Sequence, residues 1–169
     1  MQEVLAVMGI PILTLEGYEA DDILGTVAKR SQAAGVEVSV VSGDRDLLQL
    51  ADAHIKIRIP KTSRGSTEIY DYYPEDVKAQ YQVTPAEFID VKALMGDASD
   101  NIPGVPSIGE KTATAIVAAF GSIENARAHL DEVKPPRARK ALEEHYDMAQ
   151  MSKELAAICT DCPVEFRYE

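Results

Sequence analysis

The stretch from residue 94 to residue 113, LMGDASDNIPGVPSIGEKTA, constrains the fold more than any other part of the chain. It begins and ends like a helix, yet prolines and glycines interrupt its middle. Gly104 and Gly109 allow backbone conformations that a β-carbon forbids, while Pro103 and Pro106 fix φ on both sides of the turn. The pattern predicts two helices joined by a tight loop of defined shape, with the second helix beginning near Ile108–Gly109.

The start of this second helix has the properties of an anion-binding site. The first amides of a helix have no partner within it, so those of Gly109, Glu110 and Lys111 are expected to point outward. Lys111 adds a positive charge. The pattern is typical of a helix–hairpin–helix element that holds the nucleic-acid backbone without reading its sequence. A purely structural corner between two helices would explain GVPSIG alone, but it explains less well why GDASDN stands directly in front of it. The candidate DNA-binding residues are Ser107, Ile108, Gly109, Glu110, Lys111 and Thr112.

The remaining residues predict two regions. In residues 1–73 we expect the end of a helix at 1–8, strands at 12–15, 37–43, 54–59 and 67–72, and helices at 18–35 and 44–51. In residues 74–169 we expect helices at 74–81, 85–95, 109–119, 122–130, 135–146 and 147–158, then a returning strand at 163–168. Alternating strands and helices predict an α/β fold with a mostly parallel sheet flanked by helices. A helical lobe follows it, with the helix–hairpin–helix at about 85–120.

Acidic residues gather at three places where elements begin or end. They occur in EADD at the start of a helix, in GDRD after a valine-rich strand, and in GDASD before the prolines. Because open α/β sheets place their active sites at strand ends and helix starts, we expect these groups to converge. The candidate ligands are Glu19, Asp21, Asp22, Asp44, Asp46, Asp97 and Asp100.

Converging carboxylates would repel one another and raise each other's pKa unless cations lay between them. Carboxylate oxygens suit Mg²⁺ or Mn²⁺, and we expect two ions that share the pair Asp44 and Asp46. Two such ions close together serve in-line phosphoryl transfer, which includes nuclease chemistry. For any single group, a role as a helix N-cap or helix-dipole partner is at least as good an interpretation. For all three groups at one edge of the sheet, the metal site is the better interpretation.

The formal net charge of −11 argues, taken alone, against nucleic acid as a partner. The seven candidate ligands account for seven negative charges. The net charge therefore indicates a metal site more than it argues against phosphate binding. No apolar run is long enough to span a membrane, and the N-terminus lacks the features of a secretory signal. Cys159 and Cys162 lack the second ligand pair of a zinc site. We interpret them as free thiols and expect a cytoplasmic location.

Three segments in this order resemble motifs of the 5′ nuclease (flap endonuclease-like) family. They are GYEADDILGT, VSGDRDLLQL and LMGDASDNIPGVPSIGEKTA, and the resemblance covers essentially the whole chain. It is greatest to the 5′–3′ exonuclease domains of bacterial polymerases of the DNA polymerase I type. The resemblance implies a metal-dependent enzyme that hydrolyses phosphodiesters at 5′ flaps and ends of DNA, and in RNA primers on DNA, during primer removal and repair.

The resemblance also implies roles for particular residues. Glu19, Asp21 and Asp22 match ligands of a first metal site, and Asp97 and Asp100 match ligands of a second site. The catalytic pair Asp44 and Asp46 lies between the two sites. The family also holds a K⁺ ion through backbone carbonyls of the hairpin, which would bridge the protein to a DNA phosphate. The matching positions are Leu94, Met95, Pro103, Val105 and Ile108.

Two family features are not found among these residues. Members of the family begin with a strand that carries an aspartate ligand, and a basic arch follows it. We therefore expect a fragment of the nuclease domain with weak activity, and an exposed sheet edge that favours self-association. The alternative is a catalytically inactive duplex-DNA-binding module that retains only the helix–hairpin–helix lobe. A related phosphohydrolase or RNase would explain the carboxylates but not IPGVPSIGEKTA.

Overall fold

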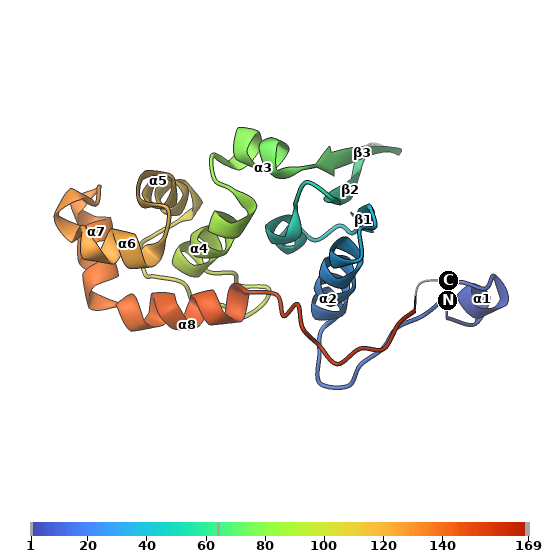
Figure 1. The fold of residues 1–169 in the computed structure, drawn as a ribbon. Helices are drawn as coiled ribbons and strands as arrows, with labels where there is room; N and C mark the ends of the chain where they lie inside the picture. Colours follow the sequence, from blue (N-terminus) through green and yellow to red (C-terminus); the bar gives the residue numbers. More distant parts are fainter. Residues whose placement is uncertain (1, 64, 168–169) are drawn as a thin grey trace.

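A computed structural model describes residues 2–63 and 65–167 of the chain. Figure 1 shows a small sheet region beside a larger helical lobe. The sheet region contains α1 (Gln2–Val7), α2 (Ala20–Ala33), β1 (Val38–Val41), the 3₁₀ helix η1 (Asp46–Leu50), β2 (Ile55–Ser63) and β3 (Ser66–Tyr72). The lobe contains α3 (Pro74–Tyr81), α4 (Pro85–Met95), α5 (Glu110–Phe120), α6 (Ile123–Ala128), η2 (Leu130–Glu132), α7 (Pro136–Glu144) and α8 (Tyr146–Ala156).

The sheet has the strand order β1-β2-β3 among the described residues. β1 pairs with β2 in parallel, with Val40 opposite Ile57, and β2 pairs with β3 antiparallel, with Ile59 opposite Tyr70. Ile55 and Ile57 are fully buried, as alternation along a strand with one covered face requires. The α/β class with a helical lobe is confirmed, and the sheet is mixed.

Helix α4 lies at the centre of the molecule. Its start is fixed by a capping box, in which the Thr84 hydroxyl accepts from the Glu87 amide and the Glu87 carboxylate accepts from the Thr84 amide. Pro85 occupies the first turn, where its missing N–H costs nothing. α4 packs against η1, α5 and α8, so one continuous core joins the sheet region to the lobe. The division at residues 73 and 74 stays a prediction.

Two predicted strands are wrong. Residues 12–15 are extended but pair with no strand among the described residues, and Ile12 is exposed. Residues 163–167 also form no strand, and Tyr168 lies outside the described residues. Instead, the Arg30 guanidinium of α2 donates to the carbonyl of Cys162 at 2.6 Å and to that of Val164 at 2.7 Å. The Arg30 side chain therefore binds backbone carbonyls of this segment, in place of the strand pairing that the prediction requires.

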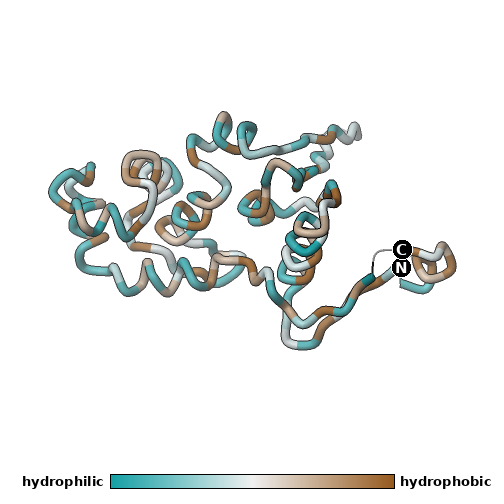
Figure 2. The backbone as a smooth tube through the Cα atoms, in the orientation of Figure 1, coloured by the Kyte–Doolittle hydropathy of each residue, from teal (hydrophilic) through white to brown (hydrophobic). Residues whose placement is uncertain are grey.

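Helix α1 lies apart from the core (Figure 1). Figure 2 shows apolar positions on α1 and on the segment that follows it, away from the packed interior. Their exposed side chains include Val4, Val7, Met8 and Ile10. No helix among the described residues has the length and apolar character needed to cross a membrane.

The hairpin between α4 and α5 depends on a close contact of two glycines. Gly96 ends α4 with φ of 72°, and Gly104 in the following loop has φ of 64°. A β-carbon on Gly104 would lie 2.4 Å from the Gly96 amide nitrogen, and one on Gly96 would lie 2.7 Å from the Ile102 carbonyl oxygen. Both positions thus need glycine for their dihedral angles and for space.

We predict that Gly104→Ala destabilises the protein by about 2–4 kcal/mol, because it combines a left-handed backbone with a backbone clash. Urea unfolding followed by circular dichroism measures the change. Gly43→Ala is the matched control, since a β-carbon there meets no atom within 4 Å. Equal stability of the two variants would contradict this account of the hairpin.

Candidate metal centre and nucleic-acid interface

The first acidic group lies at the start of α2. Glu19 is the N-cap residue, and its amide donates to Asp22 Oδ2 at 3.1 Å as part of a capping box. The other oxygen of Asp22, Oδ1, accepts from the Cys159 amide at 2.9 Å. Asp22 is therefore a helix cap and a link to the segment after α8, which agrees with the structural interpretation for this residue. Asp21 makes no hydrogen bond of this kind among the described residues.

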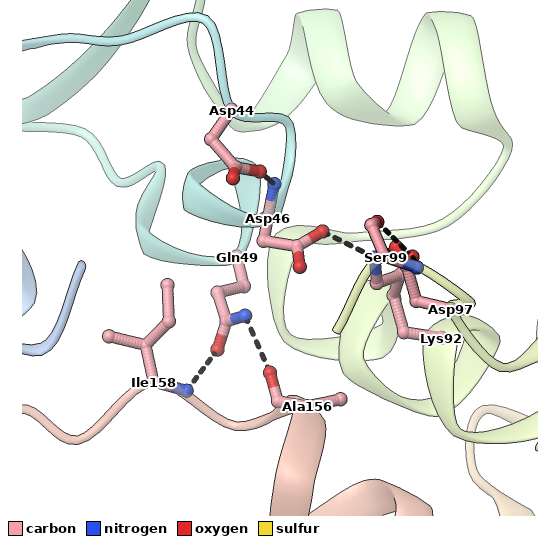
Figure 3. Close-up of polar contacts among 8 residues, drawn as sticks. All are labelled: Asp44, Asp46, Gln49, Lys92, Asp97, Ser99, Ala156 and Ile158. Atoms are coloured by element: carbon pink, nitrogen blue, oxygen red, sulfur yellow. Dashed lines mark hydrogen bonds and ion pairs between the residues drawn. The ribbon is translucent and has the colours of Figure 1, made fainter. Parts of the chain in front are cut away.

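The second acidic group follows β1. Asp44 Oδ1 accepts from the Asp46 amide at 2.9 Å, and the Asp44 amide donates to the Ser42 hydroxyl at 3.1 Å. These bonds turn the chain from the strand into η1, whose first residue is Asp46. The carboxylate of Asp46 is thereby directed away from the sheet and towards α4 (Figure 3).

The third acidic group lies in the loop after α4. The backbones of Asp97 and Ile102 bond to each other in both directions, at 2.9 Å and 2.8 Å. Asp97 Oδ1 also accepts from the Ser99 amide at 2.9 Å and from the Ser99 hydroxyl. Carboxylate oxygens of Asp46, Asp97 and Asp100 lie within 4.8 Å of one another, so the second and third groups meet.

The three groups surround two adjoining cavities. One cavity, of about 200 Å³, is lined by six carboxylates: Glu19, Asp21, Asp22, Asp44, Asp46 and Asp100. The other, of about 390 Å³, is lined by Asp97 and lies between η1, α4 and α5. Asp44 and Asp46 line both cavities. The structure therefore brings all seven predicted ligands to one connected region.

Burial and mutual repulsion both raise pKa values in this region. Burial, followed by the charges of Asp44 and Asp46, raises the pKa of Asp21 from 3.8 to about 6. Burial also raises the pKa of Asp46, although hydrogen bonding and attraction from Lys92 oppose the shift. In contrast, hydrogen bonds from Lys92 and Ser99 hold the pKa of Asp97 below its usual range. Lys92 thus supplies positive charge on the α4 side, whereas no cation within residues 2–63 and 65–167 pairs with the carboxylates at α2.

Lys92 is the functional residue that the sequence analysis missed. Its side chain is 6% exposed, and its Nζ lies 2.7 Å from Asp46 Oδ1 and forms a second ion pair with Asp97. Burial acts to lower the pKa of Lys92, but its two carboxylate partners outweigh that effect and raise it. A lysine within the apolar sequence FIDVKALM of α4 is the signal that could have identified it.

Gln49 is a second residue without a sequence signal. Its side-chain amide donates to the Ala156 carbonyl at 3.0 Å, and its oxygen accepts from the Ile158 amide at 2.9 Å (Figure 3). Ala156 and Ile158 line the smaller cavity. Gln49 therefore attaches the end of α8 to η1 and closes the wall of the cavity opposite the carboxylates.

The predicted phosphate-binding terminus has the expected geometry. α5 begins at Glu110, and its N-cap Gly109 provides no side-chain cap. The amides of Gly109, Glu110 and Lys111 donate no hydrogen bond to any described residue, and the Lys111 side chain is exposed. The Thr112 amide donates to the Gly109 carbonyl at 3.0 Å, so the unpaired amides end at Lys111.

Ser107 and its neighbours form the turn before α5. Ser107 has φ of 70°, and its hydroxyl accepts from the Arg137 guanidinium at 2.9 Å. Arg137, on α7, is thereby brought beside the hairpin loop. The carbonyls of Leu94 and Val105 each accept one backbone N–H, at 2.8 Å and 3.1 Å, which leaves one lone pair on each for another partner.

The donor set fits hard divalent cations. Eight carboxylates, which are the seven predicted ligands and Glu110, line the two cavities, and no histidine does. Oxygen donors of this kind are the ligands that Mg²⁺ and Mn²⁺ prefer. The raised pKa of Asp21 is expected for a partly buried carboxylate whose neighbours are anionic. The residues present therefore suit a metal centre.

We predict that Lys92→Met destabilises the metal-free protein by about 2–4 kcal/mol, since it leaves two partly buried carboxylates without a counter-ion. Mn²⁺ should then raise the melting temperature of the variant more than that of the wild type, because the ion replaces the lost charge. Thermal melts with EDTA and with Mn²⁺ measure both effects.

Lys153→Met is the control for this experiment. Lys153 pairs with Asp90 and Glu124, away from the two cavities. Its loss should reduce stability while leaving the response to Mn²⁺ unchanged. The same Mn²⁺ response in all three proteins would contradict the role of Lys92 as an internal counter-ion.

We predict that Asp21→Asn stabilises the metal-free protein at pH 7.5, on the order of 1 kcal/mol after allowance for solvent screening. The native pKa of about 6 lies above the ordinary value of 3.8, so the native state is penalised as Asp21 ionises. The gain should shrink as the pH falls from about 6 to 4 and should vanish with Mg²⁺. Denaturant unfolding across this pH range tests the sign, with the remote Asp131→Asn as control.

Comparison with known proteins identifies relatives of both regions. Residues 1–82 match the family described as 5′-3′ exonuclease, N-terminal resolvase-like domain, and residues 83–169 match 5′-3′ exonuclease, C-terminal SAM fold. The chain is 51% identical to DNA polymerase I of Bacillus caldotenax over 165 residues, which are 98% of this chain and 19% of that protein. DNA polymerase I of Bacillus subtilis (strain 168) is 49% identical, over 98% of this chain and 18% of that protein.

Solved structures show the same relationship. The T5 5′-exonuclease with bound divalent metal ions (zinc) superposes with a TM-score of 0.77 at 25% identity, over 93% of this chain and 56% of that one. A bacteriophage T5 flap endonuclease complex with DNA and metal ions gives 0.74 at 25% identity, over 94% and 56%. The catalytic core of Rad2 with DNA substrate, at 18% identity and a TM-score of 0.60, shares the fold.

The chain thus spans about a fifth of the curated relatives and a little over half of the phage enzyme. The matched families meet at residues 82 and 83 and together cover the chain from end to end. The motifs that first suggested a nuclease lie in both of them. The chain belongs to the 5′–3′ exonuclease family.

Proposed function

We propose that this chain carries the metal-binding and DNA-binding parts of a structure-specific 5′–3′ exonuclease and flap endonuclease. One observation carries the proposal: carboxylates from three separate segments converge at cavities beside the hairpin that leads into α5. A purely structural capping role for each group leaves that convergence unexplained. The metal-bound and DNA-bound phage relatives support the same conclusion.

In this proposal Glu19, Asp21 and Asp22 serve one metal site, and Asp97 and Asp100 serve the other. Asp44 and Asp46 lie between the sites, where their position on both cavities supports a shared role. When bound, Mg²⁺ or Mn²⁺ would activate water and stabilise charge on the phosphate. Lys92 orients the carboxylates of Asp46 and Asp97 by pairing with both.

The substrate would be duplex DNA with a 5′ flap or end, or an RNA primer on DNA. The uncapped amides of Gly109, Glu110 and Lys111 support backbone phosphate binding without base reading. Arg137, beside the same loop, is a second candidate phosphate donor. A K⁺ ion would bridge the DNA to carbonyls of the hairpin, at Leu94, Met95, Pro103, Val105 and Ile108.

We further propose a cytoplasmic location, as expected for a chain with free cysteines. Self-association is also proposed. Within the described residues β1 pairs only with β2, so its other edge offers unpaired backbone groups to a second chain. The alternative function is a duplex-DNA-binding module without catalysis, which the exposed Lys111 and the uncapped α5 terminus favour by themselves.

A labelled 5′-flap duplex with Mn²⁺ tests the proposal. We expect slow, metal-dependent release of the flap, reduced at least about 10²-fold in Asp44→Asn because the ions lose a shared ligand. Lys111→Ala should weaken binding and lower the slope of log affinity against log salt by about one. Lys78→Ala, an exposed lysine on α3, is the control for lost surface charge.

The outcomes separate the two functions. Cleavage lost in Asp44→Asn supports the nuclease. Binding that depends on Lys111, without metal-dependent cleavage, indicates the binding module instead. Binding that follows base sequence, or that is equal in Lys111→Ala and the wild type, would contradict the assignment of the hairpin.

A further inference from the structure

The larger cavity beside the carboxylates has walls that metal binding does not explain. Its volume of about 390 Å³ lies in the range of small-molecule sites. Its lining includes carboxylates and Lys92. It also includes apolar and aromatic side chains, which no divalent cation requires: Tyr81, Val83, Phe88, Val91 and Met95.

Tyr81 provides a fixed aromatic surface in this cavity. Its ring is half-buried and meets the ring of Phe88 edge-on, at 5.3 Å between centroids and 75° between planes. Its hydroxyl accepts from the Gln80 side chain at 3.3 Å, and Gln80 in turn accepts from the Tyr72 hydroxyl at 3.0 Å. Because the half-buried Tyr81 also lines the cavity, part of its side chain is accessible to a ligand there, and the hydrogen bonds hold the ring in place.

Arg45 supplies an unpaired cation on the same cavity. It lies between Asp44 and Asp46 in the sequence, is exposed, and forms no ion pair or hydrogen bond through its side chain within the described part of the chain. Lys92, the other cation on this cavity, is already paired with two carboxylates. Arg45 is therefore the cation that is available to a ligand.

These features together match one class of ligand. A nucleotide combines a flat base, which stacks on an aromatic ring, with a phosphate, which binds a guanidinium and divalent ions. Four acidic residues line the cavity against two basic ones, so an anion needs a divalent cation in order to enter. An apolar ligand would leave the charged side chains of the cavity without a partner. A simple anion would make no contact that requires the aromatic side chains.

We propose that this cavity is a nucleotide subsite, in which the base stacks on Tyr81 and the phosphate faces Arg45. The proposal rests on the proposed nuclease function and extends it: one nucleotide of the substrate strand would be held through its base, next to the carboxylates. The hairpin holds phosphates without regard to the base, whereas this subsite responds to the presence of a base.

The test uses two small probes in the presence of Mg²⁺, deoxyadenosine 5′-monophosphate and 2-deoxyribose 5-phosphate, with affinities from NMR titration of the whole chain. The wild type should bind the nucleotide at least about fivefold more tightly, the lower limit for a base stacked on an aromatic side chain. Tyr81→Ala should abolish this ratio, and Tyr81→Phe should keep it. Arg45→Ala should weaken both probes by the same factor.

Tyr146→Ala is the matched control, a half-buried tyrosine on α8 outside this cavity, and should keep the ratio. Equal affinity of the wild type for both probes, or a ratio that survives Tyr81→Ala, would overturn the proposal. Should Tyr81→Ala unfold, a nuclear Overhauser contact between the base and the Tyr81 ring in the wild type decides the question, and its absence refutes the subsite. Flap cleavage is not part of this test, so loss of cleavage with an intact ratio refutes only the nuclease.

Discussion

The ion pairs of Lys92 with Asp46 and Asp97 are the interaction on which the site depends. The lysine projects from the central helix α4, while its partners belong to the start of η1 and to the loop after α4. One ammonium group thus joins the sheet region to the helical lobe at the place where their acidic residues meet. Without it, two carboxylates would share a desolvated space, and the favourable alternative would be for the segments to separate. No cation among the described residues pairs with the carboxylates at α2, and burial together with the charges of Asp44 and Asp46 raises the pKa of Asp21 there.

The hairpin gives this charge arrangement a fixed relation to the proposed phosphate site. Gly96 and Gly104 allow the two arms of the loop to touch, and the Gly104 amide donates to the buried Ser152 hydroxyl of α8 at 3.1 Å. The loop is therefore closed on itself and also attached to α8 through Ser152. Asp97 at its beginning and Lys111 just beyond its end are therefore joined by one closed loop. A phosphate held at α5 would lie at a defined separation from the carboxylates, which is what cleavage at one position along a strand requires.

The elements that the sequence predicted well are those with local signals. Thr84, Pro85 and Glu87 mark the start of α4, and Gly121 marks the end of α5 by adopting φ of 78°. The strands predicted at 12–15 and 163–168 were wrong because a strand depends on a partner that the local sequence does not specify. The convergence of the acidic groups was predictable from their positions at element ends. Lys92, Gln49 and Arg30 were missed, because each acts through a contact with a segment remote in sequence or with a loop whose path was unknown.

The two hydrogen bonds of Asp22 have a consequence for the far end of the chain. One carboxylate oxygen holds the cap of α2, and the other holds the Cys159 amide, yet the same residue lines the cavity that suits a metal ion. Each oxygen keeps a lone pair for an ion, but an ion bound there withdraws negative charge from the carboxylate and so weakens its hydrogen bond from the Cys159 amide. Attachment of residues 157–164 to α2 and occupancy of the cavity are then thermodynamically linked, and the linkage acts equally in both directions. A partner that holds or releases residues 157–164 would therefore change the affinity for the ion without contacting the ion.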